Sequence, residues 1–267
     1  MSQDCNKKVS IIMGVYNGQD TIEKCIESIQ QQTYTNWEFI ICDDASTDKT
    51  VSIVQKYMSN DARIKLLKNI NNMRLAASLN RCLAVASGEY VARMDADDLS
   101  SKDRIEKQVS FLNSHPECDC VGTNRIIFDD KGEKEERKSI EFPMANVLLH
   151  DVPFAHPTIM MRKSVYDSLN GYTESKETMR AEDLDLWFRF FASGFNGYNI
   201  QEPLYLYRES VEDYKKRTVK AGIMTSKVFI NGYRLLGVPK YKWIFALKPI
   251  ISALLPNWLM RLYHNKK

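Results

Sequence analysis

The first half of the chain alternates short apolar runs with stretches in which apolar residues recur every three or four positions. The apolar runs predict strands at Val9–Val15, Trp37–Cys42, Ile64–Leu67 and Tyr90–Met94. The intervening periodicity predicts a helix that Asp20 caps with Glu23 three residues on, a second around Val51–Tyr57, and a third over Leu75–Ala86 before Gly88. Because parallel strands need crossover connections, we expect an α/β fold with a mainly parallel central sheet and helices on both faces.

The second half of the chain is less regular. Beyond Lys102 we expect a helix to about Asn113 and a strand near Val121–Phe128, followed by a solvated loop over the charged segment Asp129–Lys138. A later helix is expected over Glu182–Ala192, where Gly194 ends it. Cationic helices should follow at the C-terminus.

Polar clusters follow three of the predicted strands. They are Tyr16-Asn17-Gly18, Asp43-Asp44-Ala45-Ser46 and Asp95-Ala96-Asp97-Asp98. Ligands of parallel α/β sheets bind beside the carboxyl ends of the strands, so these clusters mark the expected site.

Composition adds little that is unusual. With 267 residues and 44% apolar content, the chain can bury one large core, or a medium and a small one. The polar N-terminus lacks an apolar run of signal-peptide length, so the expected compartment is the cytoplasm. The six cysteines are predicted to be reduced and structural, since Cys118-x-Cys120 has no second cysteine pair to complete a metal site.

The charge is concentrated at the C-terminus. The net charge is +3, yet no Asp or Glu follows Asp213. Apolar residues fill the stretch from Trp243 to Leu259, which Lys248, Pro249 and Pro256 interrupt, so it is expected to lie on an anionic membrane surface rather than to span it. The alternatives are packing against the rest of the chain or a dimer contact.

The string Asp95-Ala96-Asp97-Asp98 places three carboxylates within four positions. They repel one another unless a positive group lies among them, and Mg²⁺ or Mn²⁺ with a bound diphosphate would supply that charge. The alternative is a capped turn that opens a helix. Neither G-x-G-x-x-G nor G-x-x-x-x-G-K-[ST] occurs, so a dinucleotide or P-loop site is not indicated.

A second acidic cluster, Glu182-Asp183-Leu184-Asp185, opens the helix that continues with Trp187. Acidic residues are favoured in a first helical turn, which is the structural explanation. A carboxylate beside a tryptophan at the edge of a cleft also suits a general base with a sugar-stacking partner.

In their order and spacing these strings resemble the inverting family 2 glycosyltransferases of the GT-A fold, bacterial surface-polysaccharide type. The likeness extends to about Arg208 and rests on Val9–Asn17, Asp43–Asp48, Asn80 within Leu75–Asn80, Asp95–Asp98, His156-Pro157, and Glu182-Asp183 before Leu186-Trp187. It implies a Rossmann-like GT-A sandwich with a helical C-terminal extension. The implied parts are a nucleotide-sugar-binding half at 1–98, an acceptor-binding and catalytic half at 99–210, and a basic amphipathic tail at 211–267.

The resemblance also implies a donor site for a UDP-sugar. Val15 and Tyr16 would line the nucleobase pocket, with Asp44 bonded to uracil and Asp95 to the ribose or the sugar. The same site would include Asn17, Arg74 and Ala96. Arg74, Arg93 and Arg208 are candidates for phosphate or sugar contacts, with surface ion pairs as the alternative.

For catalysis, the resemblance implies that Asp97 ligates Mn²⁺ or Mg²⁺ at the diphosphate and that Asp183 is the base that deprotonates the acceptor. His156 is a further candidate metal ligand, which could instead contact the diphosphate or the acceptor, or be structural. The acceptor site is expected to include Glu182, Trp187 and Arg208.

The implied activity is transfer of a single hexose or N-acetylhexosamine to a glycan or a polyprenyl- or lipid-linked acceptor of O-antigen, capsule or lipooligosaccharide, because the Q-x-x-R-W string of processive members is absent. The protein is also expected to associate with the inner face of the cytoplasmic membrane and to be able to form a homodimer. It is not expected to bind nucleic acid. One alternative is a catalytically silent nucleotide-sugar-binding scaffold. The motifs expected of a phosphohydrolase or a nucleotidyltransferase are absent from this sequence.

Overall fold

The computed structural model describes residues 6–209 and 218–254. Within them, one nine-stranded sheet has the order β3-β2-β1-β4-β8-β6-β9-β5, with β7 paired to β6. The strands are β1 (Val9–Val15), β2 (Trp37–Asp43), β3 (Ile64–Lys68), β4 (Tyr90–Arg93), β5 (Leu99–Ser100), β6 (Cys120–Asp129), β7 (Gly132–Arg137), β8 (Met160–Arg162) and β9 (Gly197–Arg208).

The first four strands are parallel, as expected. β1 lies between β2 and β4, and β3 pairs with β2. The other end of the sheet is mixed, because β8 runs antiparallel to both β4 and β6, while β9 is parallel to β6. One sheet therefore crosses the predicted boundary at residue 98, and the three-part division stays a prediction.

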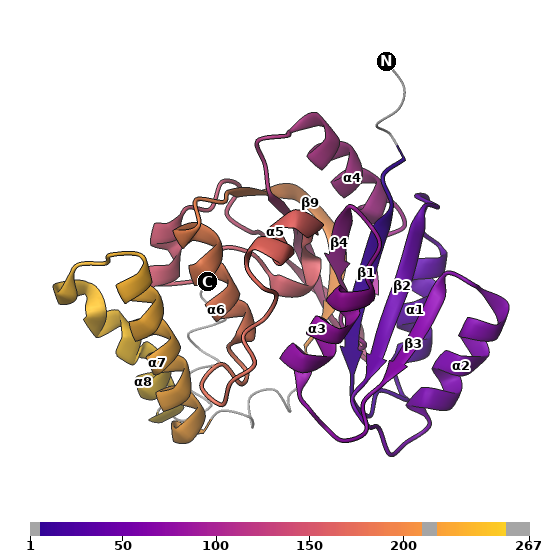
Figure 1. Cartoon of the computed structure of the whole chain (residues 1–267), viewed down its shortest axis with the longest axis horizontal. Coiled ribbons are helices and arrows are strands. Elements are labelled where there is room, and N and C mark those ends of the chain that lie inside the picture. Colours follow the sequence, from indigo (N-terminus) through magenta and orange to yellow (C-terminus); the bar gives the residue numbers. More distant parts are fainter. Residues whose placement is uncertain (1–5, 210–217, 255–267) are drawn as a thin grey trace.

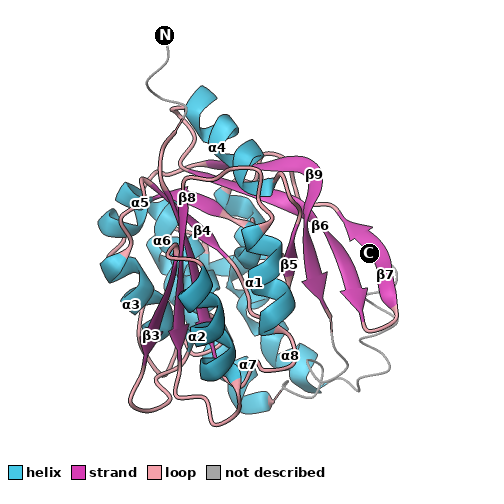
Figure 2. Ribbon diagram, turned by 90° about the vertical axis from the view of Figure 1, so that its right-hand side faces the viewer, coloured by secondary structure: helices cyan, strands magenta, loops and turns pink. Residues whose placement is uncertain are grey.

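Helices cover both faces of the sheet (Figures 1 and 2). Successive residues of β1 point to opposite faces, so Ile11 and Ile12 belong to different apolar clusters. The cluster of Ile11 includes side chains of α1 (Ile22–Gln30) and α4 (Arg104–Ser114), and α2 (Thr50–Asn60) packs beside α1. The cluster of Ile12 includes α3 (Leu75–Val85), α5 (Lys163–Ser168) and α6 (Glu182–Ala192).

Two local predictions were wrong, and one strand was missed. Asp20 does not cap α1; Thr21 holds the N-cap without a side-chain bond, and the carbonyl of Gly18 accepts from the backbone N–H of Ile22 at 3.0 Å. The charged segment after Asp129 contains strand β7, because its backbone pairs with β6 while its side chains remain in water. The twelve-residue strand β9 was not expected, because its apolar residues do not alternate regularly.

The described cysteines are free and buried, as predicted, while Cys5 lies outside the described residues.

The helical C-terminal extension is confirmed as far as residue 254. It comprises α7 (Val219–Leu235), the 3-10 helix η4 (Lys240–Leu247) and α8 (Lys248–Leu254), which lie at the left of Figure 1 beside α6. Among the described residues, no helix is both long and apolar enough to cross a bilayer.

The apolar residues of the C-terminal helices differ in their surroundings, and the membrane and dimer interpretations stay predictions. Trp243 packs against the main core and donates from Nε1 to the carbonyl of Val238 at 2.9 Å, and Ala246 is buried. Ile244 and Ile251 instead remain largely exposed. The stretch from Leu255 to Leu259 lies outside the described residues.

Candidate active site

The loops after β1 and β2 meet at the carboxyl edge of the sheet, where hydrogen bonds hold them together. Asn17 accepts from the backbone N–H of Thr47 at 2.9 Å, and its own N–H donates to Ser46 Oγ at 2.9 Å. Tyr16, beside it, is 51% exposed, whereas Val15 is buried. Tyr16 is therefore accessible for a stacking contact, while Asn17 is already used to join the two loops.

Asp44 is buried and organises the start of α3. One carboxylate oxygen accepts from Asn69 Nδ2 at 2.6 Å and from the backbone N–H of Met73 at 2.8 Å; the other accepts from the N–H of Arg74 at 2.8 Å. Arg74 has φ = 77°, a left-handed conformation that a non-glycine residue rarely adopts. A carboxylate has about four acceptor positions, and the three bonds above leave Asp44 able to accept one more from an N–H of a nucleobase.

The acidic string after β4 contains three carboxylates in different environments. Asp95 accepts from Arg93 Nη2 at 2.6 Å, and the guanidinium of Arg93 is almost fully buried. Asp97 is exposed. Asp98 is buried, where it accepts from Tyr205 Oη at 2.8 Å and from the backbone N–H of Arg208 at 2.7 Å.

Sequence reasoning gave Asp98 no role of its own, although the structure shows that it joins the acidic string to β9. Burial, together with the charges of Asp95 and Asp97, raises the pKa of the Asp98 carboxyl well above its usual range. No local pattern distinguishes Asp98 from Asp97, because the difference arises from β9, more than a hundred residues away.

The exposed carboxylate of Asp97 fits a metal that is held largely by its substrate. Mg²⁺ commonly takes one or two protein carboxylates and completes its shell with phosphate oxygens and water. In the described parts of the chain no cluster of three or more His, Cys, Asp or Glu forms a ready metal site. The residues present therefore suit an ion that arrives with a diphosphate.

His156 lies in η2 (His156–Thr158), inside the core and only 8% exposed. Its Nε2 is 2.9 Å from the hydroxyl of Tyr172, and its ring packs at an edge against Trp187. Burial and the charge of Arg93 lower the pKa of His156 well below its usual range, which favours the neutral form of the ring. These contacts fit the structural interpretation, and metal ligation by His156 stays a prediction.

Glu182 and Asp183 open α6 in partly enclosed positions. Burial raises the pKa of Glu182 to about 7, with a further contribution from the charge of Asp183. Burial also raises the pKa of Asp183. The hydrogen bond from the backbone N–H of Leu184 and the charge of Arg93 partly offset this increase. Asp185, on the same turn, instead pairs with Arg189 at 2.8 Å.

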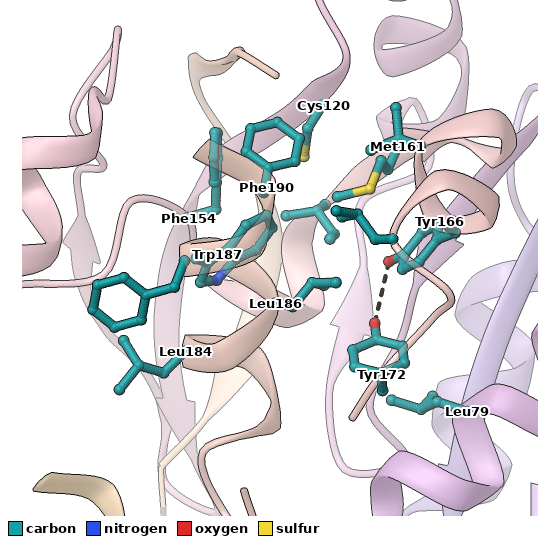
Figure 3. Close-up of a cluster of buried hydrophobic side chains, with 14 of the residues drawn as sticks. Leu79, Cys120, Phe154, Met161, Tyr166, Tyr172, Leu184, Leu186, Trp187 and Phe190 are labelled. Carbon is teal, nitrogen blue, oxygen red and sulfur yellow. Dashed lines mark hydrogen bonds between the residues drawn. The ribbon is translucent and has the colours of Figure 1, made fainter. Parts of the chain in front are cut away.

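The expected position of Trp187 at the edge of a cleft was wrong. Its side chain is fully buried, with its ring centroid 4.8 Å from that of Phe154 and 5.7 Å from that of Phe190 (Figure 3). Trp187 follows Asp183 by one helical turn, on the face of α6 that packs into the core. A sugar cannot stack on a ring that is enclosed in this way.

A cavity of about 340 Å³ lies between the start of α3 and the start of α6. Its lining includes Arg74, Glu182 and two cations that sequence reasoning missed, Lys176 and Arg180. Arg180 also has a left-handed backbone, with φ = 67°. The segment that carries these cations is joined to α3 by Asn80, which donates to the carbonyl of Tyr172 at 2.9 Å and to Glu174 at 2.7 Å.

Arg208 lies beside the acidic string. Its Nε donates to the carbonyl of Asp97 at 3.1 Å, and its Nη1 pairs with Asp130 at 2.6 Å. The structure thus brings Arg208 together with Asp97 and Asp98, while Arg74 and Glu182 line the cavity. An acceptor role for Arg208 stays a prediction.

Comparison with known proteins identifies the family. The family model described as "Glycosyl transferase family 2" matches residues 10–169, more than half of the chain. The chain belongs to glycosyl transferase family 2. The EpsE protein of Bacillus subtilis (strain 168), named as a glycosyltransferase, is 46% identical over 261 residues, which cover 97% of this chain and 94% of EpsE.

Two further relatives have more informative names. AmsE of Erwinia amylovora, an amylovoran biosynthesis glycosyltransferase, is 30% identical over 215 residues, which cover 78% of this glycosyltransferase and 79% of AmsE. WfgD of Escherichia coli, named UDP-Glc:alpha-D-GlcNAc-diphosphoundecaprenol beta-1,3-glucosyltransferase, is 42% identical over 104 residues, which cover 39% of this chain and 40% of WfgD.

Solved structures confirm the GT-A fold class. TarS of Staphylococcus aureus, crystallised with UDP, matches with a TM-score of 0.63 at 21% identity, over 92% of this chain and 81% of that one. The mannosyltransferase PcManGT from Pyrobaculum calidifontis, in complex with GDP-Man and Mn²⁺, matches with a TM-score of 0.66 at 20% identity, over 98% and 79%. At these identities the likeness establishes the fold alone.

Proposed function

We propose that this glycosyltransferase moves one hexose or N-acetylhexosamine from a UDP-sugar to a hydroxyl of a glycan or lipid-linked acceptor, with inversion, in the synthesis of a bacterial surface polysaccharide. The names of AmsE and WfgD support the polysaccharide and lipid-linked parts. The UDP complex of TarS supports a nucleotide-sugar donor.

The observation that carries the proposal is the difference between two groups of carboxylates. Asp97 is exposed at the carboxyl edge of the sheet, beside the paired Asp95. Glu182 lines the cavity and Asp183 follows it, both with raised pKa values. One group suits the charge of a metal–diphosphate complex, and the other suits proton removal from an acceptor.

Asp183 is the base in this proposal. A carboxylate whose pKa is raised by burial binds a proton more strongly than an ordinary aspartate, which favours proton removal from a hydroxyl. The acceptor oxygen forms a bond to the anomeric carbon, and the bond from that carbon to the UDP oxygen breaks on the opposite face. The acceptor proton goes to Asp183, and the bonding electrons leave with UDP, so a single displacement inverts the configuration.

The other residues bind the donor. Tyr16 offers an exposed ring on which the uracil can stack. Asp44 holds the Met73–Arg74 turn, from which Arg74 reaches the cavity. A Mn²⁺ or Mg²⁺ ion at Asp97 would neutralise charge on the departing diphosphate. Lys176 and Arg180 add positive charge on the opposite side of the cavity.

The test is turnover of a UDP-sugar panel with Mn²⁺, Mg²⁺ or EDTA, using wild type, Asp97→Ala and Asp183→Asn. Removing a base typically costs about 10²- to 10⁴-fold in rate, so Asp183→Asn should lose transfer and still bind UDP. Asp185→Asn, on the same helical turn but paired with Arg189, is the matched control and should retain transfer. If UDP-sugars bind but no acceptor supports wild-type turnover, the protein is a nucleotide-sugar-binding scaffold instead.

A further inference from the structure

The C-terminal helices carry an unusual share of exposed apolar side chains. Of the nineteen large hydrophobic residues that are exposed in the described parts of the chain, nine lie between residues 218 and 254. They are Val219, Ile223, Leu235, Tyr241, Ile244, Phe245, Leu247, Ile251 and Leu254. Exposed apolar side chains that are concentrated in one region of a protein often mark an interaction site.

The same helices carry positive charge without any carboxylate. Lysine or arginine occurs six times between residues 218 and 254, at Lys220, Lys227, Arg234, Lys240, Lys242 and Lys248. Aspartate and glutamate are absent from residues 214–267 of the sequence. Two copies of this surface would repel each other, whereas an anionic surface would attract it, so its charge argues against self-association.

The contacts of α7 and α8 place part of this surface at the cavity end of the molecule. Lys227 pairs at 3.2 Å with Glu177, in the segment that lines the cavity, and Gly232 packs against Phe188 of α6. The start of α7 therefore lies at the same end as the start of α6, which carries Glu182 and Asp183.

Helix α8 lies at this end too. A Cβ added to Gly222, one turn into α7, would come within 2.8 Å of the carbonyl oxygen of Pro249 in α8. Figures 1 and 2 both show α7 and α8 in the lower part of the molecule, the part toward which the arrows of β1 and β2 point in Figure 1. We call Lys220, Ile223, Lys248, Ile251 and Leu254 the basic apolar face.

We propose that the basic apolar face binds the surface of an anionic lipid bilayer and thereby holds the cavity of the enzyme next to a lipid-linked acceptor. The negative charge of such a surface attracts the lysines, and the isoleucine and leucine side chains can enter the interfacial region. The acceptor part of this proposal rests on the proposed function. The lipid-binding part does not.

The test is co-sedimentation of the full chain with phosphatidylcholine vesicles, with and without phosphatidylglycerol. The wild type should bind the anionic vesicles and lose affinity as salt is raised. The double change Ile251→Glu and Leu254→Glu should weaken binding at least about tenfold, because it places charges where the apolar contact forms. Lys220→Gln with Lys248→Gln should weaken it by a similar factor and reduce the salt dependence.

Met58→Glu is the matched control, because Met58 is also an exposed apolar residue but lies on α2, in the other half of the molecule. It should bind vesicles like the wild type. Equal binding to neutral and anionic vesicles, or a loss with Met58→Glu as large as with the α8 variant, would overturn the proposal. So would a dimer in vesicle-free solution that the α8 variant abolishes, since a second copy would then occupy the face.

Hydrolysis of the UDP-sugar without vesicles separates this proposal from the proposed function. If the wild type turns over its donor but does not bind anionic vesicles, only the membrane proposal fails. If it binds the vesicles as described but turns over no donor, the proposed function fails while the lipid-binding surface stands.

Discussion

Neighbouring carboxylates of this enzyme have different properties because of what surrounds each of them. On α6, burial raises the pKa values of Glu182 and Asp183, while Asp185 pairs with Arg189. After β4, Asp95 pairs with Arg93, and Asp98 bonds to β9. Distant neighbours matter for two of these groups: Arg93 and Asp95 influence the pKa of Asp183, and β9 holds Asp98.

A first prediction concerns Glu182 and pH. Below about pH 4.5 the carboxyl of Glu182 is protonated in both the folded and the unfolded chain. Between about pH 4.5 and 7 the unfolded chain ionises it more readily than the folded chain, so the free energy of unfolding falls as the pH rises. Above about pH 7 the free energy of unfolding stays at this lower value. Glu182→Gln removes this loss. Without donor and metal, its melting temperature should exceed that of the wild type near about pH 8 and match it near about pH 4.5. A difference that does not change with pH would contradict the raised pKa.

A second prediction concerns Asp98. Asp98→Ala leaves the Tyr205 hydroxyl and the Arg208 N–H without their acceptor, which should cost on the order of 1–3 kcal/mol for each group in urea unfolding. Asp98→Asn keeps one oxygen acceptor and should lose less. Asp97→Ala is the neighbouring exposed control and should stay within about 0.5 kcal/mol of the wild type. Equal losses at the two positions would show that Asp98 has no structural role.

At the scale of elements, α6 links the proposed base to the C-terminal helices. Its first turn carries Asp183, and Phe188, further along, packs against α7. A Cβ on Gly232 would lie 2.2 Å from ring atoms of Phe188, so α7 approaches α6 this closely only because that residue is glycine.

A third prediction follows from this contact. Gly232→Leu should destabilise the enzyme by about 1–3 kcal/mol, because overpacking must separate α7 from α6. It should also reduce transfer, since α6 holds Asp183. The control is Asn231→Leu, the same new side chain on an adjacent exposed position of α7, which should have little effect on either measurement. Comparable losses in both variants would assign the effect to the leucine itself rather than to the contact with Phe188.

The elements also differ in how well the sequence predicts them. Strands β1 to β4 and helices α1 to α3 have regular apolar periodicity, because each buries one side or is wholly enclosed. Strand β7 has no such pattern, since backbone pairing with β6 holds it while its side chains face water. Strand β9 shifts register against β6 between Thr123 and Arg125, which interrupts its alternation.

At the scale of the whole molecule, the donor site is expected to assemble its metal and nucleotide together. Among the described residues no group of three or more His, Cys, Asp or Glu side chains is arranged to hold a metal ion. A fourth prediction is therefore that Mn²⁺ alone or UDP alone raises the melting temperature only slightly, while both together raise it by more than the sum. Asp97→Ala should abolish the extra rise. A full shift with Mn²⁺ alone would indicate a preformed metal site.

The sequence by itself determined the strand–helix alternation, the positions of the acidic strings after strands and at the start of a helix, and the family. Local periodicity and motif order suffice for these, because each depends on residues close together in the chain. Only the tertiary structure decided that Trp187 is in the core, that Asp98 joins β9, and that Lys176 and Arg180 line the cavity. These surroundings depend on segments that are separated in the sequence, by more than a hundred residues for Asp98 and β9, and no local pattern records them.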